Sequence, residues 1–368
     1  MATPNRAPNR AVTYQPKDLA EAPEVDAFLA RLGLGPFDRT TITSNAGRND
    51  NWVGTTTEGT AVFVKRLRYK DAADGISRTQ AIYAAADGRL DFPRLLGADQ
   101  DNGLLVFEAV PEARSGAQLA SDDAFDDDVC DRAATVLAAL HSLEADGIDA
   151  GEHPFPPVEN FEALSLAQYL NVTHGQLEIW RLLHGDEQIA RALRDLRATE
   201  VPDLKARCPI HGDLRLDQFL LSGGRLYLTD FEESRIGDPA RDIGAFAGEW
   251  LFQAIHVTPS TLAGASQLGH IATHEEIVAT GSAELERRRP KVRRFLRTYL
   301  EAAPTAITSD EQLLVRAASY AGWHMIDRML AGGMGTSRLS PVSKAAAGIG
   351  RTVLLSPADF TSSLGLEA

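Results

Sequence analysis

Residues 208–242 place Asp213, Asp230 and Asp242 in and beside short apolar runs. Asp213 follows a His-Gly pair on a loop between an apolar entry and an apolar exit, and Asp230 ends a short hydrophobic strand after a Gly-Gly turn. Two such loops can bring their carboxylates together, one to accept a proton from an attacking hydroxyl and one to hold Mg²⁺ on a nucleotide. The amide of Gln218 can supply a further oxygen ligand. The spacing therefore predicts a metal-assisted site for phosphoryl transfer.

The same order occurs in protein-kinase-like enzymes, where an amide follows the catalytic-loop Asp by five residues and a strand then ends in a metal-binding Asp. Over about residues 40–355, HGDLRLDQ…LTDFEESRIGDPARDIGAF and LAALHSL resemble the aminoglycoside-phosphotransferase-type kinases, which share that fold. The resemblance implies that Asp213 is the catalytic base or hydroxyl-orienting carboxylate. It also implies that Asp230 and Gln218 bind Mg²⁺, and that Asp242 and His211 support the catalytic loop. The family usually has Asn in place of Gln218, although bacterial maltokinases carry a comparable Gln.

The resemblance also implies a nucleotide site in the first third of the chain. Lys65, in AVFVKRL, lies at the end of an expected strand, as does the kinase lysine that holds the α and β phosphates. The preceding turn, GRNDN, would cover the phosphates with Gly47, Arg48 and Asn49, although it could also be an ordinary polar hairpin tip. ATP and Mg²⁺ are the cofactors expected for this site.

Two further contacts are expected near the nucleotide. The backbone groups of Glu108 and Val110, in VFEAV, would meet adenine. The usual Glu partner of the kinase lysine is missing from the helix expected at 76–87, and Gln80 is the residue that we expect to face Lys65 there. Gln80 would pair by a hydrogen bond in place of a salt bridge.

The order of elements predicts an α+β chain with a bilobed protein-kinase-like fold. A small N-lobe of antiparallel sheet plus helix is expected over 21–107, after a flexible Pro- and Asn-rich arm at 1–20. A hinge at 108–115 would lead to a large, mainly helical C-lobe at 116–360, which would carry the catalytic residues and bind the acceptor. Helical periodicity is clear from Asp122 onward.

Composition limits the remaining possibilities. The 368 residues are 44% hydrophobic and 24% charged, with a formal net charge of −14. That charge argues against nucleic acid or an anionic membrane as the main partner, because phosphate binding depends on Lys and Arg. The two cysteines, Cys130 and Cys208, are too few for a disulfide framework, and the N-terminal segment lacks a signal-peptide pattern. We expect a cytoplasmic protein.

The acceptor is less constrained than the donor. TSNAGRNDNW and TTTEGTAVFVKRL, together with the catalytic stretch, look similar to the kinase subunit of class V (lexapeptide-type) lanthipeptide synthetases. The resemblance implies phosphorylation of Ser and Thr in a ribosomal precursor peptide, with a lyase and a cyclase of the same pathway as further partners. The basic segment ERRRPKVRRF (286–295) could grip an acidic peptide, or it could be a solvated helix face.

Two alternatives remain open at this point. One is a small-molecule kinase for an aminoglycoside or a sugar. The other is a pseudokinase that binds a precursor peptide or a lyase as a scaffold, which the glutamines at 80 and 218 would favour.

Overall fold

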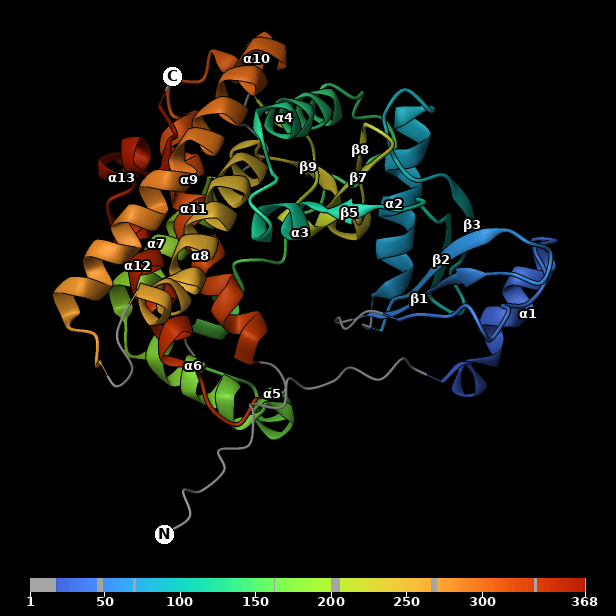
Figure 1. Cartoon of the computed structure of the whole chain (residues 1–368), viewed down its shortest axis with the longest axis horizontal. Coiled ribbons are helices and arrows are strands. Elements are labelled where there is room, and N and C mark those ends of the chain that lie inside the picture. Colours follow the sequence, from blue (N-terminus) through green and yellow to red (C-terminus); the bar gives the residue numbers. More distant parts are fainter. Residues whose placement is uncertain are drawn as a thin grey trace.

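The computed structural model describes residues 18–44, 49–68, 71–161, 163–199, 206–265, 270–333 and 336–367. A small lobe carries the N-terminal strands, and a larger helical lobe contains the rest of the described chain (Figure 1). The α+β class and the two-lobed architecture expected from the sequence are therefore confirmed. In the part of the chain that the structure describes, no helix is long and apolar enough to span a bilayer.

The N-lobe is built on a four-stranded antiparallel sheet with the order β1-β2-β4-β3. Its core contains Trp52 and the alternate residues Val62 and Val64 of β2, because successive side chains of a strand point to opposite faces. Its elements are η1 (Leu19–Glu21), α1 (Pro23–Arg31), β1 (Asp50–Thr55), β2 (Ala61–Arg66), α2 (Ala72–Ala86), β3 (Leu95–Asp99) and β4 (Leu104–Glu108).

Two expectations for this lobe need correction. The flexible arm predicted for 1–20 is wrong at its end: residues 19–21 form a 3₁₀ turn whose Leu19 is buried in the core of the lobe, while residues 1–17 lie outside the described part. The apolar-polar pattern of TTITS (40–44) predicts a further strand before β1, but this segment forms only an isolated bridge between Thr43 and Val53.

Short strands connect the lobes and position the catalytic loops. β5 (Arg114–Ser115), β7 (Phe219–Ser222) and β8 (Arg225–Leu228) form one small sheet, and β6 (Cys208–Ile210) pairs with β9 (Arg235–Gly237). The 3₁₀ turns η3 (Leu216–Gln218) and η4 (Phe231–Glu233) follow the two proposed catalytic segments. Residues 109–113 join β4 to β5, within the segment proposed as a hinge.

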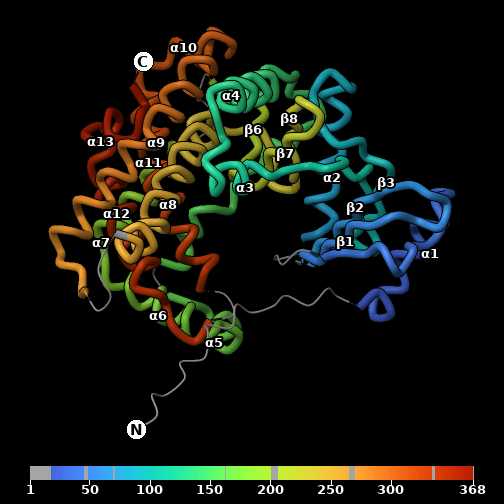
Figure 2. The backbone as a smooth tube through the Cα atoms, in the orientation of Figure 1, coloured from blue at the N-terminus to red at the C-terminus, as the bar shows by residue number. Residues whose placement is uncertain are grey.

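The rest of the C-lobe is helical, and its chain runs through the green-to-red part of the trace in Figure 2. α8 packs on α9 and α11, and α11 also packs on α12. Gly244 permits the close approach of α8 to α11, because a Cβ there would lie 2.2 Å from the carbonyl oxygen of Ala317. The elements are α3 (Gly116–Ser121), α4 (Asp127–His141), η2 (Val158–Phe161), α5 (Leu166–Asn171), α6 (His174–His184), α7 (Glu187–Ala198), α8 (Ala240–Ala265), α9 (His274–Ala302), α10 (Thr305–Thr308), α11 (Leu313–Gly333), α12 (Pro341–Leu355) and α13 (Pro357–Leu364).

Candidate active site

The loop after β6 carries Asp213, whose side chain is 40% exposed. Gly212 makes this loop possible: its φ is +85°, and a Cβ there would lie 2.6 Å from the carbonyl oxygen of Glu233. A side chain at this position would therefore be strained by both backbone conformation and contact. The local sequence His-Gly-Asp thus places a carboxylate at the surface of an otherwise buried loop.

Asp242, at the start of α8, lies beneath that loop. Its carboxylate accepts hydrogen bonds from the backbone N–H groups of His211 (2.6 Å) and Gly212 (3.0 Å). The ring Nε2–H of His141 donates to the same carboxylate at 3.0 Å, and the hydroxyl of Tyr299 donates to His141 Nδ1 at 2.6 Å. Burial alone would raise the pKa of Asp242, but the bonds from His141 and His211 hold it below its usual value. This geometry matches the supporting position that the family resemblance implies.

A second support of the loop was not foreseen from the sequence. Glu249 of α8 is buried and accepts the backbone N–H of Leu216 at 3.3 Å. His324 of α11 donates from Nε2 to the other oxygen of Glu249 at 2.8 Å. Since α11 is about a hundred residues away in sequence, no local pattern could have paired these residues.

His211 is buried and its ring Nε2–H donates to the carbonyl oxygen of Thr229 at 2.8 Å, while its ring packs against Phe231. The imidazole therefore ties the loop of Asp213 to the segment of Asp230. These contacts are those of a supporting residue, which is the role expected for His211.

Lys65 and Asp230 come together across the two lobes. Lys65 points from β2 and forms ion pairs with Asp230 and with Glu232, and its side chain is nearly buried. Burial lowers the pKa of Lys65, but the two carboxylates outweigh this and raise it. Asp230 has φ +75°, an uncommon conformation for a residue other than Gly, and such strain is concentrated at functional sites.

The expected pairing of Gln80 with Lys65 is wrong. Gln80 lies on the exposed face of α2, and the buried face carries Ile76 and Thr79. A neighbouring residue, Arg78, donates to the backbone oxygen of Glu232 at 2.6 Å. The carboxylates that balance Lys65 thus come from the C-lobe, where the DFEE string offered Glu232 two residues after Asp230.

Asn49 is the part of the predicted phosphate-covering turn that the structure describes. Its side-chain amide donates to both oxygens of Glu232, at 3.1 and 3.2 Å. Gly47 and Arg48 lie outside the described residues. Asn49, Lys65 and Glu232 therefore join the two lobes at one point.

Gln218 is buried, and its carbonyl oxygen accepts the backbone N–H of Arg215 at 2.7 Å. Its amide nitrogen is buried without a hydrogen-bond partner among the described residues. The unpaired group is thus a donor, which suits a phosphate oxygen better than a metal ion. Service as a metal ligand, as the sequence predicts, would use the second lone pair of an oxygen that is already engaged.

Arg215 is a site residue that the sequence analysis passed over. Its guanidinium donates to Asp213 at 2.7 Å and to Asp217 at 3.1 Å. Burial lowers the pKa of Arg215, but Asp213, Asp217 and Asp230 together raise it. The chain thus places a permanent cation beside the proposed base.

The two backbone N–H groups predicted to contact adenine differ in whether they already donate a hydrogen bond within the protein. The N–H of Glu108 already donates to the carbonyl oxygen of Arg94 at 2.9 Å. No described residue accepts the N–H of Val110, which leaves that group as the candidate donor.

Asp327, on α11, is another residue that the sequence did not reveal. Burial raises the pKa of its carboxyl group, and the nearby charge of Asp213 raises it further. Asp327 forms no hydrogen bond or ion pair with the described residues. It is a carboxyl group close enough to Asp213 for the two charges to interact.

The donor set fits a nucleotide-bound Mg²⁺ ion. Among the described residues there is no cluster of three or more His, Cys, Asp or Glu that could hold a metal ion alone. Asp230 and Glu232 provide two carboxylates bridged by Lys65, and Mg²⁺ is commonly held by one or two carboxylates together with substrate phosphates. We therefore expect the phosphates to complete the coordination.

A bilobed kinase-like fold with a cross-lobe lysine and a loop carboxylate is the architecture of a phosphotransferase. The chain belongs to the phosphotransferase enzyme family, whose model matches residues 41–275. The expected class of enzyme, an ATP-dependent kinase that acts on alcohol groups, is thereby confirmed, and ATP with a divalent metal ion is typical of this family. No curated protein matches the chain.

Solved structures agree on the fold. The choline kinase LicA from Streptococcus pneumoniae is 16% identical, with a TM-score of 0.52 over 92% of this chain and 99% of that one. A choline/ethanolamine kinase family protein from Mesorhizobium loti is 18% identical, with a TM-score of 0.52 over 95% and 99%. The amicoumacin kinase hAmiN, in complex with AMP-PNP, Ca²⁺ and Ami, is 13% identical, with a TM-score of 0.51 over 92% and 95%.

Proposed function

We propose that this kinase phosphorylates Ser and Thr hydroxyls of a ribosomal precursor peptide, which prepares phosphate elimination to dehydroamino acids in lanthipeptide biosynthesis. The observation that carries the proposed chemistry is the pairing of a braced, solvent-reachable Asp213 with the cluster of Lys65, Asp230 and Glu232. The peptide acceptor is supported by the similarity of residues 43–52 and 55–67 and of the catalytic stretch to class V synthetase kinases. A lyase and a cyclase of the same pathway would be its partners.

The residues divide the work in the following way. Asp213 orients the attacking hydroxyl and receives its proton as the new oxygen–phosphorus bond forms and the bond to the β-phosphate oxygen breaks, which releases ADP. Lys65 binds the α and β phosphates. Asp230 and Glu232 would hold the metal ion. Gln218, the further ligand expected from the sequence, would reach the ion only through the second lone pair of its carbonyl oxygen, while its amide N–H would face a phosphate oxygen. A bound metal ion supplies charge neutralisation for the transferred phosphoryl group.

The proposal also assigns roles to residues around the nucleotide and between the lobes. The turn of Gly47, Arg48 and Asn49 would cover the phosphates, and the backbone of Val110 would meet adenine. Arg215 would keep the carboxylate of Asp213 in position until the acceptor binds. The segment at 108–115 would serve as the hinge between the lobes.

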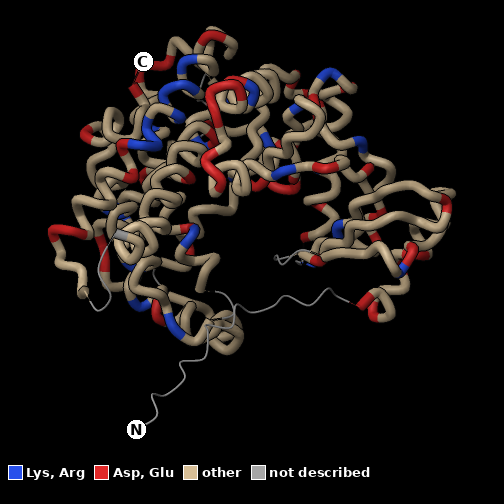
Figure 3. Tube along the Cα trace, in the orientation of Figure 1, with Lys and Arg blue, Asp and Glu red and all other residues tan. Residues whose placement is uncertain are grey.

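The basic segment at 286–295 does not support a peptide-binding role. Arg287 pairs with Asp123 and Glu284, Arg288 with Glu284, and Arg294 with Asp131. Figure 3 shows this basic part of α9 beside the acidic start of α4. Most of these basic side chains are therefore engaged in ion pairs within the protein, so an acidic peptide would have to bind to another surface.

A small-molecule acceptor is the second candidate, and Asp327 favours it. An unpartnered carboxylate near Asp213 suits a cationic acceptor, and the structural neighbours include two choline kinase relatives. The pseudokinase scaffold has less support, since Lys65, Asp213 and Asp230 are all present.

Incubation with Mg-ATP and parallel acceptors tests the proposal. The acceptors are an acidic Ser/Thr-rich peptide, choline and an aminoglycoside, and mass spectrometry detects the added HPO₃. We expect transfer to the peptide, with a loss of about 100-fold or more in Asp213→Asn. Asp217→Asn is the matched control, because Asp217 contacts the same Arg215 from the exposed side of the loop.

Each other outcome assigns a different function. Transfer to choline or to the aminoglycoside without transfer to the peptide would assign a small-molecule acceptor. Absence of any transfer, together with no thermal shift on adding Mg-ATP, would assign the scaffold role.

A further inference from the structure

The helix α5 exposes an unusual amount of apolar surface. Leu166, Tyr169 and Leu170 are 73%, 56% and 71% exposed, and none of the six residues of α5 is buried. The helix is held by its capping box, in which Ser165 and Gln168 cap each other, and by a bond from Gln168 to Asn160 at 2.9 Å. A helix this short gains little stability from its own backbone. Most of the surface of Leu166 and Leu170 therefore lies outside the packed core of the fold.

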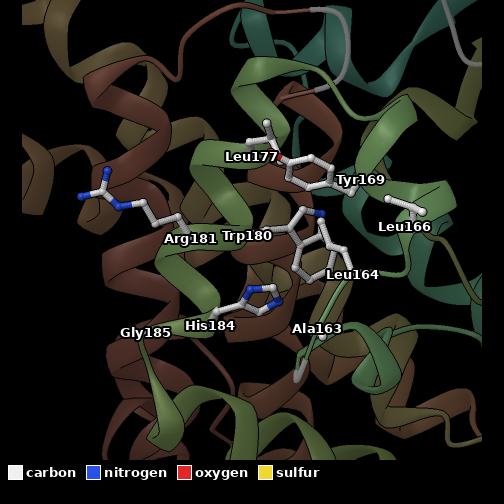
Figure 4. Close-up of a pocket in the computed structure, with 9 residues that line it drawn as sticks. All are labelled: Ala163, Leu164, Leu166, Tyr169, Leu177, Trp180, Arg181, His184 and Gly185. Atoms are coloured by element: carbon white, nitrogen blue, oxygen red, sulfur yellow. The ribbon is translucent and has the colours of Figure 1, made fainter.

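A hollow of about 740 Å³ lies between α5, α6 and the chain that precedes α5. Figure 4 shows the rings of Tyr169 and Trp180 side by side in it, with Leu164 and Leu177 next to them. The ring of Phe161 packs edge-on against the ring of Trp180, with ring centroids 6.0 Å apart. The hollow is open to solvent, and its size and its apolar, aromatic lining lie within the range of ligand sites.

The described lining of the hollow carries a positive charge, that of Arg181. Among its described lining residues there is no Asp or Glu, whereas the chain as a whole carries −14. Arg181 lines the hollow and extends outward from it, and no described residue forms an ion pair with it (Figure 4). Glu178, the acid on the same helix, is committed to Lys344 and to the backbone of Leu339. The hollow therefore suits a ligand that is apolar and carries carboxylates.

The hollow is connected to the catalytic loop but is separate from it. A Cβ on Gly212 would lie 3.3 Å from His153 Nε2, and Asn160, seven residues later, accepts a hydrogen bond from His184 at 2.8 Å. Seven residues span at most about 25 Å. None of the proposed catalytic residues lines the hollow. A long molecule, such as a peptide, could therefore extend from the hollow to Asp213.

We propose that the α5–α6 hollow docks an apolar, acidic segment of the peptide acceptor, while a Ser or Thr of the same peptide reaches Asp213. This inference rests on the proposed function. The acidic segment is chosen because the described lining contains Arg181 and neither Asp nor Glu, and a second copy of the chain is the other occupant that the test distinguishes.

Fluorescence anisotropy with a synthetic helical peptide of Leu, Phe and Glu tests the proposal. One twin of the probe has Lys in place of Glu, and a second has Ser in place of Leu and Phe. We expect the first probe to bind best, and a Leu166→Ser/Leu170→Ser double variant to bind it about tenfold more weakly or worse. Arg181→Glu should weaken the acidic probe and strengthen its Lys twin. Ile349→Ser, on an exposed site of α12, is the control and should change nothing.

Folding is not at risk in these variants, because the substituted side chains are exposed, and unchanged thermal unfolding verifies it. Equal affinity of the wild-type protein and the double variant for the acidic probe would overturn the proposal. A wild-type dimer that the double variant converts to a monomer, measured by sedimentation, would assign the surface to a second copy and would also overturn it.

A transfer assay separates this inference from the proposed function. Phosphorylation of a peptide with the apolar acidic segment should have its KM raised by the double variant, while a short Ser/Thr peptide without that segment should be unaffected. Transfer that is insensitive to the double variant would refute the docking site and leave the kinase assignment intact. Probe binding without transfer to any peptide would refute the peptide kinase and leave the docking site intact.

Discussion

Replacing Asp242 by Asn removes a buried charge that three donors share. Asn retains one oxygen acceptor, so the N–H of His211 or that of Gly212 would face an amide NH₂ group in place of an oxygen. Hydrogen bonds to charged groups contribute about 1.5–3 kcal/mol each, and breaking one partner of a buried pair costs about 3–5 kcal/mol. We expect the free energy of unfolding to fall by about 3 kcal/mol or more.

The same substitution should also reduce turnover. The two N–H groups lie immediately before Asp213, and a displacement of the catalytic group by about 1 Å can cost about 100-fold in rate. Urea denaturation would measure the stability, and initial rates at a temperature where both proteins are folded would measure kcat. The matched control is Asp238→Asn: Asp238 is equally buried, four residues away, and is bonded to Arg316 at 2.6 Å, away from the loop. It should lose stability with little loss of kcat.

The pH dependence has a definite sign. Because the folded-state pKa of Asp242 is lowered, its stabilisation is present above its unfolded pKa, about 3.9, and is lost as the pH falls through the folded pKa. The stability difference between the wild-type protein and Asp242→Asn should therefore be constant near neutral pH and shrink below about pH 4. A difference under about 1 kcal/mol at pH 7, or equal losses of kcat in both variants, would refute the reasoning.

Two other predictions concern Lys65 and Gly212. Lys65→Met removes the ammonium group that pairs with Asp230 and Glu232. The free energy of unfolding should therefore fall by up to about 3 kcal/mol. Mg²⁺ alone should raise the melting temperature of the variant more than that of the wild-type protein. An equal response to Mg²⁺ in both proteins would contradict a metal site at these carboxylates. Gly212→Ala should cost about 1–3 kcal/mol in urea denaturation, because of the positive φ and the contact with Glu233; Gly224→Ala, at φ +76° with open space around it, is the control and should cost less.

Local features of the sequence determined the fold class and the proposed catalytic order. The spacing of Asp213, Gln218 and Asp230 is set by one loop and one strand, and both are short enough for neighbouring residues to define them. The short apolar run before Lys65 predicted β2 for the same reason. Helical periodicity likewise predicted the large C-lobe.

Only the tertiary structure decided which side chains meet. Gln80 lies on the solvent-facing side of α2 and does not reach Lys65. The charge of Lys65 is balanced instead by carboxylates of the other lobe, including Glu232. The sequence left the basic segment of α9 open as a peptide-binding surface or a solvated helix face. The structure pairs it with acidic residues at and before the start of α4. Ion pairs and buried hydrogen bonds between distant elements depend on how helices and loops are oriented, which periodicity does not specify. Leu166 and Leu170 show the same limit, because apolar residues at helical spacing predict burial, and the fold leaves this helix uncovered.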